Sequence, residues 1–233
     1  MAYRYSASGT LLLSPRHVER VCSALRAHGV AHRREGNAVL IEHEERASTP
    51  STVRARAAFE EIAPFVDEPQ SIQVNCELTG AVELGFVDGR LREDKAVNVW
   101  SQRSDVPTPD DIIDELRRRG IAARAHRLKG GRKSGRRSRV FEIQPGSGGP
   151  GCRVTVKRRF WDSYDLLSVP EVYEPLCQKY HMSSARLRDA LKNATFGLEV
   201  RNPALRTASS DLVYDALVEV LEDITEGIRT DIG

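Results

Sequence analysis

Strand and helix patterns alternate through residues 1–97, and this alternation constrains the fold more than any other feature of the sequence. A strand-like segment, 3–13, runs into Ser14-Pro15, which places a favoured N-cap residue before a proline in the first helical turn. Apolar residues then recur at helical spacing as far as Gly29, and glycine is common just past the end of a helix. The start of the chain therefore predicts a strand followed by an amphipathic helix.

Further strands and a second helix follow in the same stretch. Segments 30–34 and 38–43 predict a hairpin, and a helix is expected from Thr49-Pro50 onward. Residues 72–86 then alternate apolar and polar residues on both sides of a turn, as two half-buried strands do. This β-α-β-β-α-β order is that of a ferredoxin-like unit. We therefore expect an α+β fold with antiparallel sheet, and a ferredoxin-like unit in residues 1–97.

Part of this order recurs later in the chain, because segment 25–33 aligns with segment 116–124. Leucine, arginine, glycine, alanine and arginine coincide, and a Thr108-Pro109 helix start precedes the second copy as Ser14-Pro15 precedes the first. Duplication explains this match, and so does coincidence, since a helix followed by glycine and a strand is common in α+β proteins. In either case we expect the same local structure twice, and a second ferredoxin-like β-α-β-β unit with a basic hairpin in residues 98–160.

Residues 161–233 are expected to form a helical C-terminal part. The strongest signal is an apolar stripe at helical spacing with an acidic outer face. Such a helix either docks on the core of its own chain or pairs with a second copy, so a homodimer through this helix is one expectation. The residues of the stripe are Leu212, Val213, Ala216, Leu217, Val220, Leu221 and Ile224.

Composition excludes several classes of protein. The 233-residue chain is 40% hydrophobic and 29% charged, as is ordinary for a folded soluble protein, and no run approaches the ~18 apolar residues of a membrane helix. The four cysteines are scattered without a Cys-x-x-Cys pair, which favours reduced thiols in a cytoplasmic protein without a signal peptide. The net charge is only +2, so an electrostatic argument depends on where the charges lie.

One segment is intensely basic. From Arg117 to Arg139 there are eleven Lys or Arg residues and no Asp or Glu, and a glycine-rich loop lies within it. On the next strand Arg153, Lys157 and Arg159 share one face, because side chains alternate along a strand. Guanidinium groups match phosphate oxygens, so the segment predicts contacts with the nucleic-acid backbone. The predicted contact residues are Arg132, Lys133, Arg136, Arg137, Arg139, Lys157 and Arg159.

Other partners also fit this charge. The same surface would suit an acidic protein, which would make the chain an adaptor or an immunity-type protein. A third interpretation is a solvated loop that offsets the acidic C-terminal helix. We favour non-catalytic binding of DNA or RNA, and we expect neither a cofactor nor a metal.

Residues 173–192 resemble the helix-turn-helix of phage and bacterial DNA-binding proteins. Cys177 stands where that family has a small residue in the first helix, Met182 follows the turn, and Leu187 packs the second helix. The chain departs from the pattern at His181, which replaces the usual turn glycine, and at Pro175, which falls within the first helix. The resemblance implies a recognition helix that enters a DNA groove. It implies contacts from Ser183, Ser184, Arg186, Arg188 and Lys192, whereas two short core helices with a serine cap are the alternative.

No motif for a familiar catalytic chemistry is present. The sequence lacks a phosphate-binding loop, a dinucleotide fingerprint, a zinc-protease helix and a nucleophile elbow. A metal-free endoribonuclease is the remaining enzymatic alternative, because it needs only a general base and a basic pocket. His126 lies in the basic segment and is the candidate base. Two ferredoxin-like units with a basic hairpin resemble the CRISPR RNA-processing endonucleases, but the glycine-rich C-terminal motif of that family is missing.

Overall fold

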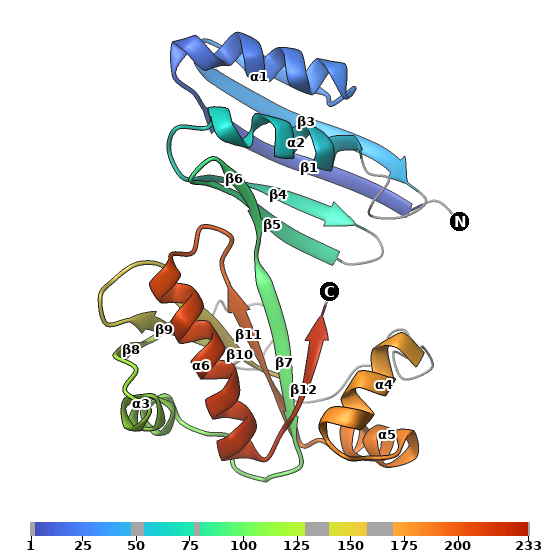
Figure 1. The fold of residues 1–233 in the computed structure, drawn as a ribbon, viewed down its shortest axis with the longest axis vertical. Helices are drawn as coiled ribbons and strands as arrows, with labels where there is room; N and C mark the ends of the chain where they lie inside the picture. The colour runs from blue at the N-terminus through green and yellow to red at the C-terminus, as the bar shows by residue number, and fades with distance from the viewer. Residues whose placement is uncertain (1–2, 48–53, 77–79, 129–139, 158–169, 233) are drawn as a thin grey trace. The chain divides into compact units, whose positions relative to one another are not determined.

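The computed structural model describes residues 3–47, 54–76, 80–128, 140–157 and 170–232 (Figure 1). These residues form a mixed α+β fold in which helices pack on two antiparallel six-stranded sheets. The chain divides into two compact units, each with its own sheet and its own hydrophobic core. The first unit is Met1–Lys95 with Pro203–Leu205, and the second is Ala96–Asn202 with Arg206–Gly233.

The first unit follows the order of elements expected from the sequence and adds one strand, β6. Its sheet has the strand order β2-β3-β1-β4-β5-β6. The elements are β1 (Tyr3–Leu12), α1 (Pro15–Ala27), β2 (His32–Glu35), β3 (Ala38–Ala47), α2 (Arg54–Ile62), the 3-10 helix η2 (Ala63–Phe65), β4 (Gln70–Cys76), β5 (Gly80–Val87) and β6 (Arg90–Glu93).

One face of the first sheet is covered by α1 and α2, which lie side by side in Figure 1. Period-two alternation buries Leu11 of β1 and Ile41 of β3, while period-3.6 spacing buries Leu25 of α1. Phe59 of α2 meets Phe86 of β5 edge to face, with 6.4 Å between the ring centroids. The apolar face predicted for the first helix is therefore confirmed as core, and α2 also buries an apolar face.

Helices α1 and α3 (Pro109–Arg118) end in the same way, as the repeated sequence segment predicted. Gly29 and Gly120 follow them with φ angles of 69° and 77°, which only glycine adopts without strain. The next residue in each copy closes the helix, because Val30 N–H donates to Leu25 at 2.8 Å and Ile121 N–H donates to Leu116 at 2.9 Å. The shared local structure is confirmed.

The second unit holds the remaining elements, with the sheet order β12-β7-β11-β10-β9-β8. Helix α3 begins with a capping box, in which Thr108 and Asp111 bond each other's backbone N–H. Besides α3, the elements are β7 (Lys95–Ser101), β8 (Ala123–Arg127), β9 (Val140–Pro145), β10 (Cys152–Lys157), α4 (Pro170–Lys179), α5 (Ser184–Lys192), β11 (Phe196–Asn202), α6 (Ala208–Thr225) and β12 (Ile228–Ile232).

The two sheets share a pattern of connections and differ by one insertion. In each unit the first strand leads through a helix into a hairpin, β2-β3 or β8-β9. A second helix then leads to a strand that pairs with the first one, β4 with β1 and β12 with β7. In the first sheet β3 pairs directly with β1, whereas β10 and β11 separate β9 from β7 in the second.

The C-terminal stretch differs from the expected helical part. It contains helices α4, α5 and α6, but it also supplies strands β11 and β12 to the second sheet. The short alternating run of β11 was missed because it lies between two helical patterns. Val213, Leu217 and Leu221 of α6 are buried in the second core, so the stripe that suggested a dimer is covered within the chain. Leu212 remains 60% exposed.

Candidate nucleic-acid interface

The second sheet has one face packed against α3 and α6 and one face that carries charged side chains. On β9 and β10, Phe141, Ile143 and Val154 point into the core, and the residues between them point the other way. The face opposite the core, here called the open face, is formed by β8 to β11. Its charged residues are Arg124, His126, Glu142, Arg153, Lys157, Glu199 and Arg201.

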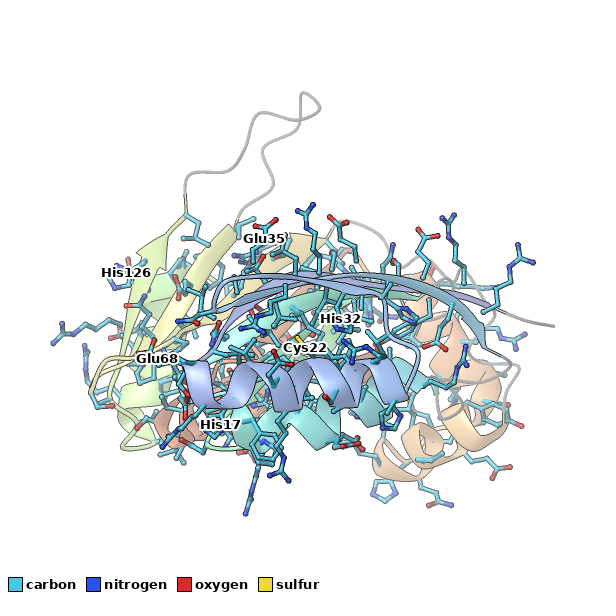
Figure 2. All side chains as sticks on the ribbon, turned by 90° about the horizontal axis from the view of Figure 1, so that it is seen from above. His17, Cys22, His32, Glu35, Glu68 and His126 are labelled. Carbon is cyan, nitrogen blue, oxygen red and sulfur yellow. The ribbon has the colours of Figure 1, made fainter. Side chains whose placement is uncertain are left out.

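Strand register arranges these charges in rows across the open face. Residues directly opposite each other on neighbouring strands point to the same face and have Cβ atoms about 4.5–5.5 Å apart. One row runs from β8 to β11 through His126, Glu142, Arg153 and Arg201. Figure 2 shows His126 on β8, the edge strand of the sheet. The rows bring together residues from four strands that are distant in sequence.

The cations of the open face differ in whether a carboxylate pairs with them. Lys157 forms an ion pair with Glu199, and Arg201 Nη2 lies 3.5 Å from the other oxygen of the same carboxylate. Arg124 and Arg153 are exposed and make no ion pair with any other residue that the structure describes. Those two side chains are therefore the ones whose charge is most available to a ligand.

Glu142 is held in place by the backbone of the residue that precedes β10. Its Oε1 accepts a hydrogen bond of 3.1 Å from the N–H of Gly151. A Cβ at Gly151 would lie 2.6 Å from the Glu142 side chain, so only glycine lets the carboxylate lie across β10 at this point. The one described acid in the His126 row is thus oriented by the fold.

The segments that carry most of the predicted contacts leave the sheet at a single end. β8 and β10 each pair antiparallel with β9, so they run in the same direction and end on the same side. The chain continues from them into 129–139 and 158–169. Of the predicted residues, Lys157 lies on the open face, and Arg153 shares that face as predicted. Arg132, Lys133, Arg136, Arg137, Arg139 and Arg159 lie outside the described residues.

Helices α4 and α5 join through a tight turn at His181. His181, which stands in place of the expected turn glycine, adopts a φ of 51°, a left-handed conformation that is uncommon for residues other than glycine. Met182 N–H donates to the Cys177 carbonyl at 3.0 Å and closes α4, and the Ser183 side chain caps α5 by accepting from Arg186 N–H. Pro175 lies inside α4.

The α4–α5 pair packs on the same side of the second sheet as the open face. Leu187 and Leu191 of α5 form a cluster with Trp100 of β7 and Ile228 of β12. The Trp100 ring fills the space above Gly197, where a Cβ would overlap it, and Gly197 is the register partner of Lys157. Helices α4 and α5 therefore cover this face of the sheet near β7 and β12, and the charged residues lie beside the covered part.

A tyrosine ties α4 to the rest of the second unit. The Tyr180 hydroxyl donates to Glu222 of α6 at 2.5 Å and accepts from the N–H of Arg229 of β12 at 2.6 Å. Burial, and then the hydrogen bond to Glu222, raise the pKa of Tyr180 well above its usual range. The hydroxyl thus stays protonated and links three elements.

The predicted helix-turn-helix contacts lie on one helix and differ in exposure. Ser183, Ser184, Arg186 and Lys192 are exposed, whereas Arg188 is half-buried. Sequence reasoning missed Arg124, Glu142 and Arg201 as members of the site. The alternation along β8 and β9 carries a signal for the first two, but Arg201 joins the row only through pairing of β10 with β11.

Comparisons with known proteins give no relative. No family model matches the chain, and neither a curated protein nor a solved structure matches it. Among the described residues, no group of three or more His, Cys, Asp or Glu side chains is placed to hold a metal ion. None of the described helices is long and apolar enough to cross a membrane. The geometry of the second unit is therefore the guide to function.

Proposed function

We propose that this protein binds nucleic acid through the open face of its second sheet. The observation that carries the proposal is the strand register, which gathers Arg124, Arg153, Lys157 and Arg201 on the open face. Glu142 and Glu199 are the two acids of that face among the described residues. The excess of guanidinium groups favours phosphate oxygens as the ligand.

The charge of the neighbouring sequence supports the same proposal. From residue 117 to residue 159 Glu142 is the single acid, while Lys and Arg recur throughout. Arg132, Lys133, Arg136, Arg137 and Arg139 stand in the connection between β8 and β9, and Arg159 follows β10. We propose that these residues extend the phosphate contacts beyond the sheet, in a largely sequence-independent manner.

We further propose that α5 acts as the base-reading helix of a helix-turn-helix. The tight turn at His181 and the exposed N-terminal residues Ser183, Ser184 and Arg186 support this assignment. Lys192 and Arg188 would then contact the phosphates that flank the groove. For the first unit, the order β2-β3-β1-β4 with α1 and α2 on one face supports a ferredoxin-like architecture.

Fluorescence anisotropy tests the proposal with labelled duplex DNA, single-stranded DNA and RNA, from about 50 to 300 mM salt. Two variants are compared with wild type. The open-face variant combines Arg124→Gln with Arg153→Gln. The connection variant replaces residues 132, 133, 136 and 137, between β8 and β9, by serine. The matched control, Arg26→Gln with Arg90→Gln, removes two exposed charges from the first unit. We expect wild type and control to bind alike, with a steep salt dependence that both test variants reduce.

Absence of binding at low salt would overturn the proposal. Equal losses in the control and in the open-face variant would also overturn it, because a general charge effect would then explain the binding. The acidic protein partner is the competing interpretation. A pull-down from lysate with the same variants would identify such a partner.

A further inference from the structure

One row on the open face combines the groups that a metal-free phosphodiesterase needs. His126 on β8 lies opposite Glu142 on β9, and Glu142 lies opposite Arg153 on β10. An imidazole, a carboxylate and a guanidinium therefore follow one another on three adjacent strands. Proton transfer by positioned side chains contributes about 10²–10⁴-fold to a rate, and a preformed cation stabilises the charge that develops on phosphate.

The spacing of the row fits one phosphodiester group. Neighbouring strands lie about 4.8 Å apart, so His126 and Arg153 flank Glu142 across roughly 10 Å. Both flanking side chains are exposed and long enough to reach a phosphate that lies above Glu142. Arg201 continues the row on β11 and adds a second guanidinium.

Glu142 has the orientation that a general base requires. The Gly151 N–H holds one of its oxygens at 3.1 Å, which leaves the second oxygen to accept a proton. Gly151 thereby acts as a positioning residue, because any side chain there would displace the carboxylate. A carboxylate repels phosphate, so its place at the centre of a cationic face is unexplained by binding alone.

We propose that this row cleaves RNA without a metal, an inference that rests on the proposed binding of nucleic acid to the same face. Glu142 takes the proton of a ribose 2′-hydroxyl, and the 2′-oxygen forms a bond to the adjacent phosphorus. The bond from phosphorus to the 5′-oxygen breaks, and protonated His126 gives its proton to that oxygen. Arg153 binds the non-bridging oxygens as their negative charge increases. The products are a 2′,3′-cyclic phosphate and a free 5′-hydroxyl end.

The test uses the full chain and a DNA oligonucleotide that contains one ribonucleotide, in buffer with EDTA. We expect cleavage only on the 3′ side of the ribonucleotide, a 2′,3′-cyclic phosphate on the product, and no cleavage of the all-DNA oligonucleotide. Wild type should show a bell-shaped dependence of rate on pH, because one group must be deprotonated and the other protonated.

Four variants assign the roles. His126→Asn and Glu142→Gln are expected to slow cleavage by at least about 100-fold while oligonucleotide affinity changes by less than about fivefold. Arg153→Gln should lower both the rate and the affinity, and Gly151→Ala should lower the rate through displacement of Glu142. The control Glu42→Gln, on an exposed position of β3, should cleave like wild type.

Each outcome separates this inference from the binding proposal. RNA that binds tightly and stays intact would overturn the cleavage site and leave the binding function standing. Cleavage that persists unchanged in His126→Asn and Glu142→Gln would also overturn it. If neither RNA nor DNA binds at low salt, both proposals fail together.

Discussion

Replacement of Asp211 by alanine is expected to destabilise the second unit selectively. Asp211 Oδ1 accepts hydrogen bonds from Arg206 Nε at 2.8 Å and from Asn202 Nδ2 at 3.1 Å. Both donors are buried, with exposed fractions of 8% for Arg206 and 0% for Asn202. The substitution removes the acceptor of both bonds near the first turn of α6, where a carboxylate is also favoured by the helix dipole.

The expected loss in the free energy of unfolding follows from these contacts. A buried polar group that loses its hydrogen-bond acceptor costs about 1–3 kcal/mol, and loss of one partner of a fully buried ion pair costs about 3–5 kcal/mol. The Asp211 side chain is 32% exposed, so water can reach this pair and reduces the ionic contribution. We therefore expect a loss of about 2–4 kcal/mol in the free energy of unfolding of the second unit.

Two buried thiols allow this loss to be measured unit by unit. Burial, and then the charges of Asp211 and Glu142, raise the pKa of Cys152 to about 12. Burial raises the pKa of Cys22 in the first core as well. Neither thiol should react until its own core opens, so the labelling rates at Cys152 and Cys22, read by mass spectrometry, report the two units separately.

A loss of 2–4 kcal/mol corresponds to labelling of Cys152 that is about 30- to 900-fold faster, with Cys22 unchanged. The control Asp215→Ala removes an exposed carboxylate from the same helix and should change neither rate by more than about threefold. The reasoning is refuted if Asp211→Ala accelerates Cys152 labelling less than about fivefold, or accelerates Cys22 equally.

Three further predictions concern the interface and its support. The double variant Arg124→Gln with Arg153→Gln should reduce the slope of log affinity against log salt for duplex DNA by about 1.8. Between about 50 and 200 mM salt, its affinity should therefore change roughly tenfold less than that of wild type. Anisotropy titrations measure the slope, and an unchanged slope contradicts phosphate contact. Tyr180→Phe should cost about 1–3 kcal/mol in urea unfolding near pH 7. Because the folded protein raises the pKa of Tyr180, its contribution is complete below the unfolded pKa of about 10 and is lost as pH rises above it. Wild type should therefore lose stability in alkali more steeply than the variant, and parallel pH profiles would refute the role of the hydroxyl. His181→Gly should stabilise the protein by about 1 kcal/mol in the same unfolding assay, since glycine adopts the left-handed turn without strain; a loss of stability would show that the imidazole makes its own contribution.

Local signals in the sequence predicted local structure well. Ser14-Pro15, Gly29 and Gly120 mark helix ends, because a proline in the first helical turn and a left-handed glycine past the last turn depend on a few adjacent residues. The alternation that placed Arg153 and Lys157 on one face is also local, and the burial of Val154 on the opposite face confirms it.

Contacts between distant segments could not be predicted in this way. The row from His126 to Arg201 depends on the pairing of β10 with β11, which are separated by residues 158–195. A connection of this length does not fix register, whereas the short turn between β9 and β10 does. The roles of Gly151 and Gly197 were equally hidden, since each becomes evident only from the side chain that lies over it.

The pairing of β7 with β12 has a consequence for how the chain folds during synthesis. β7 is the first strand of the second unit and β12 is the last, and Trp100 donates a hydrogen bond to Thr230 across this pair. The second sheet cannot be completed until β12 has left the ribosome, whereas all strands of the first sheet precede residue 95. The strands of the first sheet can therefore pair while the second unit is still being translated, whereas β7 must wait for β12, the last strand to be made.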